Sequence, residues 1–176
     1  MIAKRNIYLI GFMGTGKSAV GRATSDRLGL RFVDMDDLIV DHAGKSIPRI
    51  FAEDGEPAFR ALERQVAQDL SGQHGLVVAT GGGVILNPEN MQNFYSSGLV
   101  ICLSAHPDTI LDRVEGDTNR PLLSGSRCDK MAKMKGLLDK RLSLYDAVPH
   151  QIDTSNLTVS EVVEQLVDLY GEQSVC

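Results

Sequence analysis

The pattern with the clearest chemistry lies near the start of the chain, where Gly11-Phe-Met-Gly-Thr-Gly16-Lys17-Ser18 fits G-x-x-x-x-G-K-[ST]. Glycines in such a loop let backbone N–H groups turn inward around phosphate oxygens, and the helix that follows adds the positive end of its dipole. The lysine reaches the β- and γ-phosphates, and the serine can ligate Mg²⁺. We therefore predict a nucleotide site made by Gly14, Thr15, Gly16, Lys17, Ser18 and Ala19.

The phosphate loop alone leaves a kinase, a GTPase and a motor ATPase open. The sequence lacks the GTPase string N-K-x-D, and the chain is short, so a kinase is favoured. A conventional Walker B strand would end in an aspartate, but the apolar run Leu76–Ala79 ends at Thr80. The nearest carboxylates that could help to hold a metal ion are those of Asp34 and Asp36.

These two aspartates follow the short stretch Arg31-Phe-Val33. Read as a strand through Asp36, the alternation places both carboxylates on one side at its carboxyl end, where ligands bind in open α/β sheets. One can serve Mg²⁺ through water, and the other can orient an acceptor hydroxyl and take its proton. A helix start is the plainer alternative, because aspartate is favoured at helix N-caps.

Two further features suit an acceptor. Arg60 lies in a helical pattern with Glu63 at i+3, although a surface salt bridge explains this spacing equally well. The run Gly81–Gly83 follows a predicted strand. Residues without Cβ let a substrate approach backbone N–H groups closely, whereas the alternative is an ordinary strand-end loop.

Such residues can meet only if strands end side by side. Short apolar runs alternate with longer segments of helical period, which is typical of a parallel sheet covered by helices on both faces. We therefore predict an α/β, three-layer α/β/α sandwich of the P-loop NTPase type in a single domain, residues 1–176. The clearest helix is Val159–Tyr170, and a second apolar stripe comprises Phe59, Leu62, Val66 and Leu70. The expected strands are Ile7–Ile10, Arg31–Val33, Leu76–Ala79, Leu99–Leu103 and His150–Ile152.

One stretch interrupts this alternation. Gly116–Asp129 is rich in Gly, Ser, Asn and Pro and carries Arg120 and Arg127. A loop of this length in a compact domain is usually functional or disordered. We predict that it is a lid.

Composition narrows the partners. The 176 residues carry a formal net charge of −5 and have a pI of about 5.3, which argues against a nucleic-acid or anionic-membrane surface. The first apolar run stops at Gly11, too short for a signal peptide or a membrane span, so we expect a cytosolic protein. Cys102, Cys128 and Cys176 show no metal-type spacing, and Cys102 is expected in the core.

Together the motifs resemble the shikimate kinase family along nearly the whole chain. The pieces that carry the resemblance are the phosphate loop, Asp34-Met-Asp36, Phe51 with Gly55-Glu56 and Phe59-Arg60 and Glu63, Gly81–Gly83, Asn119-Arg120-Pro121-Leu122-Leu123, and Arg141 with Tyr145. The resemblance implies a monomer with a five-stranded, nucleoside-monophosphate-kinase-like fold. It also implies phosphate transfer from ATP to the 3-hydroxyl of shikimate, in the route to aromatic amino acids.

By matching position, Asp36, Arg60, Gly82 and Arg141 resemble the shikimate contacts, with Asp36 on the hydroxyls and both arginines on the carboxylate. A planar guanidinium can bind a carboxylate through two hydrogen bonds, which lysine cannot do. The implied roles leave Asp34 and Ser18 for Mg²⁺. The predicted catalytic groups are Lys17, Asp36 and Arg120.

On the nucleotide side, Arg120 resembles the lid arginine that reaches the ATP phosphates, and Arg113 resembles the arginine that stacks on adenine. Arg113 at a solvated helix end is the alternative. The chain departs from the family at Ser155-Asn156-Leu157, where many relatives place an arginine or glutamine near the adenine.

Two other functions remain open at this point. A gluconate-type or nucleoside-monophosphate kinase shares the phosphate loop and the lid but would handle its acceptor with other residues. A regulatory nucleotide-binding module would need no acceptor chemistry, and Asp36 and Arg60 would then be surface charges.

Overall fold

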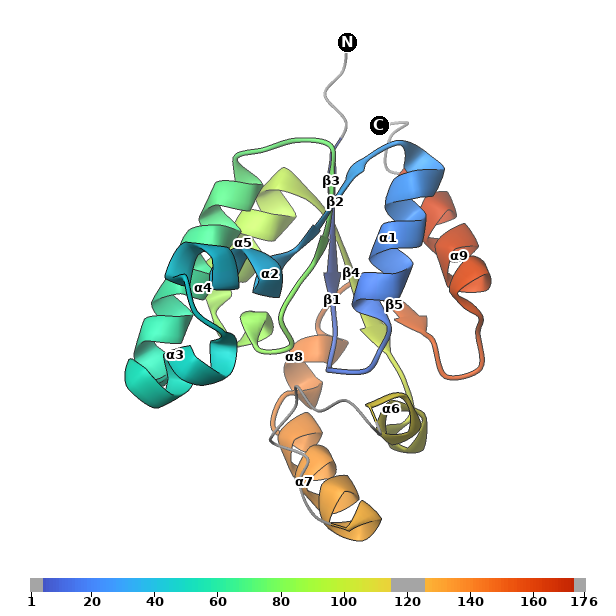
Figure 1. Ribbon diagram of the computed structural model, residues 1–176. Coiled ribbons are helices and arrows are strands. Elements are labelled where there is room, and N and C mark those ends of the chain that lie inside the picture. Colours follow the sequence, from blue (N-terminus) through green and yellow to red (C-terminus); the bar gives the residue numbers. More distant parts are fainter. Residues whose placement is uncertain (1–4, 115–125, 173–176) are drawn as a thin grey trace.

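A parallel sheet forms the centre of the molecule, with helices on both of its faces (Figure 1). The computed structural model describes residues 5–114 and 126–172. In chain order its elements are β1 (Asn6–Ile10), α1 (Lys17–Leu28), β2 (Arg31–Asp34), α2 (Met35–Ala43), α3 (Ile47–Glu53), α4 (Gly55–Ser71), β3 (Leu76–Ala79), the 3₁₀ helix η1 (Val84–Leu86), α5 (Pro88–Ser97), β4 (Gly98–Ser104), α6 (Pro107–Val114), α7 (Arg127–Asp139), α8 (Leu142–Asp146), β5 (His150–Asp153) and α9 (Val159–Glu172).

The strands follow the order β2-β3-β1-β4-β5, and each neighbouring pair is parallel. The central strand β1 is buried on both faces because all of its side chains are apolar apart from Asn6 and the Tyr8 hydroxyl. Ile7 and Leu9 pack with α1 and α9, whereas Tyr8 and Ile10 pack with the helices of the opposite face. This alternation anchors two helical layers to one strand.

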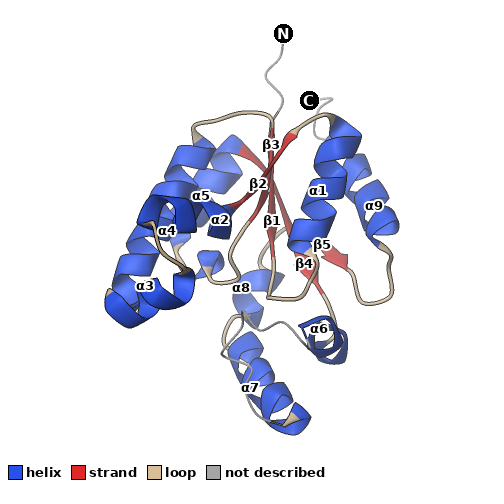
Figure 2. Cartoon of the chain, in the orientation of Figure 1, coloured by secondary structure: helices blue, strands red, loops and turns tan. Residues whose placement is uncertain are grey.

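The helices divide between the faces as the chain crosses the sheet. In Figures 1 and 2, α1 and α9 cover one face, and α2 to α5 cover the other. Helices α6, α7 and α8 lie at the end of the sheet toward which β1 points. Within residues 5–114 and 126–172, no helix combines the length and the apolar character needed to cross a membrane.

The predicted α/β/α sandwich with five parallel strands is confirmed. Each expected strand lies inside an observed one, and the ends differ by one residue at most. The expected helix Val159–Tyr170 corresponds to α9, and the second apolar stripe lies on α4. Cys102 is buried in β4, as its apolar surroundings predicted.

The structure corrects the expected path of the chain after Val33. β2 ends at Asp34, and Asp36 belongs to the first turn of α2. Asp34 caps this helix, since its Oδ1 accepts a hydrogen bond from the Asp36 amide at 3.1 Å. The prediction that strand alternation aligns Asp34 and Asp36 is therefore wrong, and the helix-start alternative is right.

The expected lid, Gly116–Asp129, is also corrected at its end. Helix α7 begins at Arg127, and Ser126 and Asp129 form a reciprocal capping box in which each accepts from the backbone N–H of the other. A serine with an acidic residue three positions later therefore starts a helix inside the stretch that was expected to be loop. Residues 116–125 lie outside the described part of the chain.

A buried polar cluster lies at the amino end of β1, opposite the end that carries the phosphate loop. Asn6 is fully buried, and its Nδ2 donates to the Tyr8 hydroxyl at 2.9 Å and to the Gln73 carbonyl at 2.7 Å. Its Oδ1 accepts from the Leu76 amide at 3.0 Å, at the start of β3. The Tyr8 hydroxyl also shares a hydrogen bond with Ser97 Oγ at 2.8 Å. One side chain thus joins β1, β3 and the loop before β3.

We predict that Asn6→Ala lowers the free energy of unfolding by about 2–4 kcal/mol, because it leaves buried backbone groups without their partners and opens a small cavity. Urea denaturation followed by circular dichroism measures this change. Asn156→Ala, at an exposed position, is the matched control and should change the free energy by less than about 0.5 kcal/mol. Equal midpoints for the two variants would contradict the stabilising role of the cluster.

Candidate functional site

The phosphate loop joins β1 to α1 and takes its shape from glycines. Gly14 and Gly16 have φ angles of 73° and 96°, in the left-handed region that side chains with a Cβ disfavour. Lys17 Nζ donates to the carbonyl oxygens of Gly11 and Phe12, each at 2.8 Å. The lysine ammonium is therefore held over the loop, where a phosphate group would lie.

The other residues predicted for the nucleotide lie in this loop and the first turn of α1. Thr15 is buried, and its hydroxyl donates to the Phe12 carbonyl at 2.8 Å, which braces the loop from inside. Ser18 and Ala19 are exposed at the start of the helix. The backbone N–H groups of this first turn have no helical partners and can bind an anion.

Ser18 and Asp34 lie together beside the loop. Ser18 Oγ donates to Asp34 Oδ2 at 2.8 Å, while the other oxygen of Asp34 caps α2. A hydroxyl and a carboxylate are the oxygen ligands that Mg²⁺ prefers, with water and phosphate oxygens completing its shell. The pair predicted for the metal ion thus fits that ion in chemistry and in place.

The loop Gly81–Gly83, which follows β3, brings the predicted acceptor residues together. A Cβ added to Gly81 would come within 2.9 Å of Asp36 Oδ1, and one added to Gly83 would come within 2.5 Å of Arg60 Nη1. The side chains of Asp36 and Arg60 therefore lie directly against this backbone. Any side chain at these two glycines would displace them.

Gly82 connects this group to the phosphate loop and to α8. Its carbonyl oxygen accepts a hydrogen bond from the Tyr145 hydroxyl at 2.6 Å and another from Arg141 Nη1 at 3.2 Å. A Cβ on Gly82 would lie 3.6 Å from the Met13 amide nitrogen in the phosphate loop. The nucleotide side and the acceptor side of the site are therefore adjacent.

Arg60 is fixed from below by a buried carboxylate. Arg60 Nη1 donates to Glu63 Oε2 at 2.8 Å, and Glu56 accepts from the same guanidinium at 3.2 Å. Glu63 is only 1% exposed, and its Oε1 has no hydrogen-bond partner within residues 5–114 and 126–172. Burial raises the pKa of Glu63, the Arg60 guanidinium opposes this shift, and Asp36 adds to it. The salt bridge between Arg60 and Glu63, considered from the sequence as a surface one, is therefore partly buried, and its Arg60 side chain lies against Gly83 in the site.

Arg113 lies in the last turn of α6 and is tied to the chain after β5. Its Nη1 donates to Thr154 Oγ1 at 2.9 Å and its Nη2 to the Thr154 carbonyl at 2.7 Å. Thr154 Oγ1 also donates at 3.0 Å to the carbonyl of Thr15 in the phosphate loop. The edge of the guanidinium is thus fixed beside the nucleotide site, and it is more than a solvated helix end. The divergent residue Ser155 accepts from the His106 amide at 2.8 Å.

The structure therefore assembles most of the predicted site. The residues at the carboxyl ends of β1, β2 and β3 come together with Arg60 from α4 and Arg141 from the turn before α8. Arg120, predicted as catalytic, lies outside the described residues. Glu63, Tyr145 and Thr154 have no role predicted from the sequence, although the i, i+3 spacing of Arg60 and Glu63 was a usable signal.

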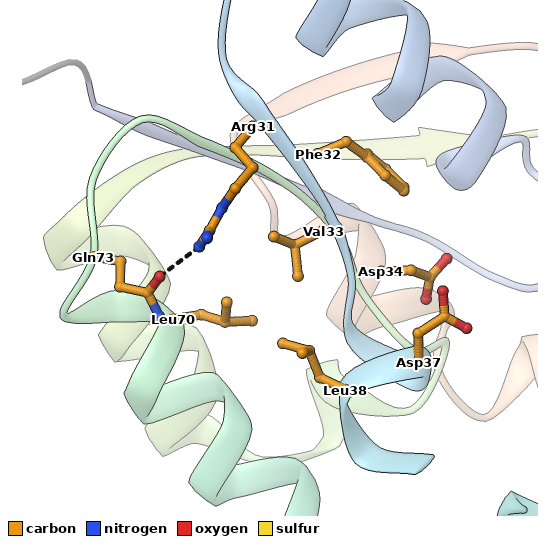
Figure 3. A pocket seen from close by; sticks show the side chains of 8 residues that line it. All are labelled: Arg31, Phe32, Val33, Asp34, Asp37, Leu38, Leu70 and Gln73. Atoms are coloured by element: carbon orange, nitrogen blue, oxygen red, sulfur yellow. Dashed lines mark hydrogen bonds between the residues drawn. The ribbon is translucent and has the colours of Figure 1, made fainter. Parts of the chain in front are cut away.

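A pocket of 470 Å³ lies beside β2, at the edge of the sheet (Figure 3). Arg31 Nη2 and Gln73 Oε1 form a hydrogen bond of 2.6 Å across one end of it. Of the predicted site residues, Asp34 alone contributes to its wall. The lining residues are Arg31, Phe32, Val33, Asp34, Asp37, Leu38, Leu70 and Gln73. This pocket lacks both acceptor arginines, so the convergence on Gly81–Gly83 defines the candidate site better than the hollow does.

Comparison with known proteins identifies relatives of this chain. The family model described as shikimate kinase matches residues 13–170. A shikimate kinase from Pelotomaculum thermopropionicum is 42% identical over 170 residues, which cover 97% of this chain and 98% of the relative. One from Thermodesulfovibrio yellowstonii is 41% identical, with 97% of each chain covered.

Solved structures agree. The shikimate kinase from Acinetobacter baumannii, determined in complex with shikimate, superposes with a TM-score of 0.90 at 34% sequence identity. The match covers 98% of this chain and 96% of that one. The family model over residues 13–170 agrees with the relatives and the superposition, which cover 97–98% of the chain, and the protein belongs to the shikimate kinase family.

Proposed function

We propose that this protein transfers the γ-phosphate of ATP to the 3-hydroxyl of shikimate, producing shikimate 3-phosphate and ADP. The observation that carries the proposal is the convergence of Asp36, Arg60 and Arg141 on the Gly81–Gly83 loop, directly beside the phosphate loop. Two guanidinium groups next to a carboxylate suit a small hydroxy acid. Membership of the family supplies the identity of that acid.

On the nucleotide side, the loop from Gly14 to Ala19 provides backbone N–H groups for the phosphates, and Lys17 provides the positive charge. To reach a phosphate oxygen, Lys17 exchanges its hydrogen bonds to the loop carbonyls for bonds to the nucleotide. Arg113, fixed by Thr154, offers the flat face of its guanidinium to the adenine. Arg120 completes the proposal as a donor to the phosphates from the lid.

Ser18 and Asp34 would hold Mg²⁺. When bound, the ion offsets charge on the phosphates of the nucleotide. The 2.8 Å hydrogen bond between the two side chains keeps both oxygens on the same side of the phosphate loop. The cap that Asp34 forms on α2 fixes the direction of its carboxylate.

On the acceptor side, Arg60 and Arg141 bind the carboxylate of the acid and compensate the cost of removing it from water. Asp36 accepts the proton of the attacking hydroxyl or orients that hydroxyl toward the phosphate. Glu63 keeps the Arg60 guanidinium in place without touching the acceptor. Because the acceptor and nucleotide sides adjoin at Gly82, the hydroxyl and the γ-phosphate can meet there.

The direct test of the function is a coupled assay of ADP release with shikimate, gluconate and AMP compared side by side. We expect ATP turnover with shikimate as the acceptor and none with gluconate or AMP. Turnover with gluconate or AMP would favour the corresponding kinase, and ATP binding without turnover on any of the three would favour a regulatory module. We further propose, from the family resemblance, that the enzyme acts as a single-domain monomer in the cytosol.

The first prediction from this mechanism concerns Lys17. Lys17→Met should lower turnover by about 10²–10³-fold, because it removes a positive donor from the phosphate that is transferred. Steady-state kinetics measures the loss, and the melting temperature shows that the fold is kept. Lys135→Met, an exposed lysine of α7, is the control with unchanged turnover. Normal turnover in folded Lys17→Met would refute the phosphate-loop assignment.

The second prediction concerns the proton acceptor. Asp36→Asn keeps the size of the side chain but removes its basicity, so kcat should fall by about 10²–10⁴-fold while nucleotide affinity is retained. Fluorescence titration with an ATP analogue measures that affinity independently of turnover. Asp37→Asn, at the next and exposed position of α2, serves as the control. If Asp36→Asn turned over normally, Asp36 would serve only as part of the helix start.

The third prediction concerns recognition of the acid. Arg60→Ala and Arg141→Ala should each weaken shikimate binding by about 2–5 kcal/mol, because the carboxylate is left imperfectly paired in a partly dry site. Isothermal calorimetry measures the change. The control is Arg64→Ala, one turn further along α4. This variant should bind shikimate normally, because Arg64 is exposed and its ion pair with Glu89 is long, at 3.9 Å. Normal binding by both active-site variants would disprove the acceptor site.

A further inference from the structure

Tyr145 is a buried side chain of α8 that the mechanism above does not use. It is 5% exposed, and its hydroxyl donates to the Gly82 carbonyl at 2.6 Å. Arg141 Nη1 donates to the same oxygen at 3.2 Å. A carbonyl oxygen has two lone pairs, so both can bind it at once. The acceptor arginine and the tyrosine are thereby joined through one backbone atom.

The direction of the Gly82 carbonyl affects both sides of the candidate site. Gly82 has the phosphate loop on one side and α8 on the other, and it has no side chain to limit rotation of its peptide. The peptide bond between Gly82 and Gly83 is trans and planar, so the direction of the Gly82 carbonyl also fixes the opposite direction of the Gly83 N–H. Gly83 in turn lies under the Arg60 guanidinium. Fixing one carbonyl therefore also orients the backbone N–H of the residue that lies against Arg60.

We propose that Tyr145 is a positioning residue for the acceptor site: its hydroxyl fixes the Gly82 carbonyl, and through it the Gly83 N–H and the Arg141 guanidinium, in the arrangement that receives the acceptor carboxylate. The proposal rests on the function proposed above and deepens it. Tyr145 acts through Gly82 and Arg141 and makes no contact with the acceptor in this scheme.

The surroundings of Tyr145 suit this role. Helix α8 spans only Leu142–Asp146, too short to be stable without tertiary contacts. Gln151 Nε2, on β5, donates to the carbonyls of Tyr145 at 2.7 Å and Val148 at 2.8 Å, which ties the end of α8 to the sheet. Burial raises the pKa of Tyr145 to about 12, with Arg141 opposing the shift, so the hydroxyl stays protonated and can donate throughout the neutral range. The Tyr145 hydroxyl is thus held in place by its tied helix and remains a hydrogen-bond donor throughout the neutral range.

The test is Tyr145→Phe, which removes one oxygen and keeps the buried ring. We expect KM for shikimate to rise about 3–10-fold, the cost of one neutral hydrogen bond, while KM for ATP changes by less than about 2-fold. Tyr170→Phe is the matched control, because the Tyr170 hydroxyl also donates to a backbone carbonyl, that of Arg5 at 3.1 Å, far along the chain from the site. It should leave both constants unchanged.

A double-mutant cycle separates positioning from general loosening. If Tyr145 and Arg141 act through the same carbonyl, the rise in KM for shikimate in the double variant Tyr145→Phe/Arg141→Lys should be smaller than the product of the two single rises. Tyr145→Phe combined with Arg113→Lys, on the nucleotide side, should give the product of the separate effects. Replacing Tyr145 with 4-aminophenylalanine restores a donor at the same position, and it should bring KM for shikimate back toward the wild-type value.

The outcomes are distinguishable. Wild-type protein without activity on shikimate would overturn the proposed function and this inference with it. An active wild type with an unchanged KM for shikimate in Tyr145→Phe, or an equal rise in both KM values, would overturn the positioning role alone. If Tyr145→Phe is too unstable to assay, the 4-aminophenylalanine protein takes its place, and failure of that protein to bind shikimate normally would also overturn the role.

Discussion

The candidate site depends on backbone that other groups can approach without meeting a side chain. Along Gly81–Gly83, the space that a Cβ would fill is taken in turn by the Asp36 carboxylate and by the Arg60 guanidinium, and the carbonyl between them receives Arg141 and Tyr145. Groups from α2, α4 and α8 meet here because the loop is narrow enough to be contacted from several sides. A single methyl group at Gly81 would displace the Asp36 carboxylate from this backbone, and one at Gly83 would displace the Arg60 guanidinium.

The two halves of the site are built in different ways. The phosphate loop takes much of its shape from local hydrogen bonds: Lys17 binds carbonyls five and six residues before it, and Thr15 binds a carbonyl three residues before it. The bond from the Thr154 hydroxyl to the Thr15 carbonyl adds a distant contact. The acceptor half is long-range, since the Tyr145 hydroxyl reaches a carbonyl 63 residues earlier in the chain. The bonds within the phosphate loop can form once β1 and α1 are in place, whereas the contact of Tyr145 with Gly82, like that of Thr154 with Thr15, requires the finished tertiary structure.

This difference explains which features the sequence predicted. Strand limits were accurate because fully buried parallel strands appear as short apolar runs, and the phosphate loop was found because its residues are contiguous. The predicted direction of the Asp36 side chain was wrong because Asp34 caps a helix that begins at the next residue, so strand alternation does not continue to Asp36. The parts played by Tyr145 and Thr154 depend on contacts with distant carbonyls, which neither periodicity nor spacing records. Glu63 is intermediate, since its spacing from Arg60 was visible but its burial was not.

The placement of the Asn6 cluster has a consequence for how the gene can vary. β1 carries the phosphate loop at its carboxyl end and the polar cluster at its amino end, so the same short strand serves chemistry at one end and stability at the other. Natural variation at the amino end would change the steady-state amount of folded enzyme, because proteases degrade unfolded chains. The turnover rate of each folded molecule would stay the same. Selection on pathway flux would then act on this strand through enzyme abundance at one end and through catalysis at the other.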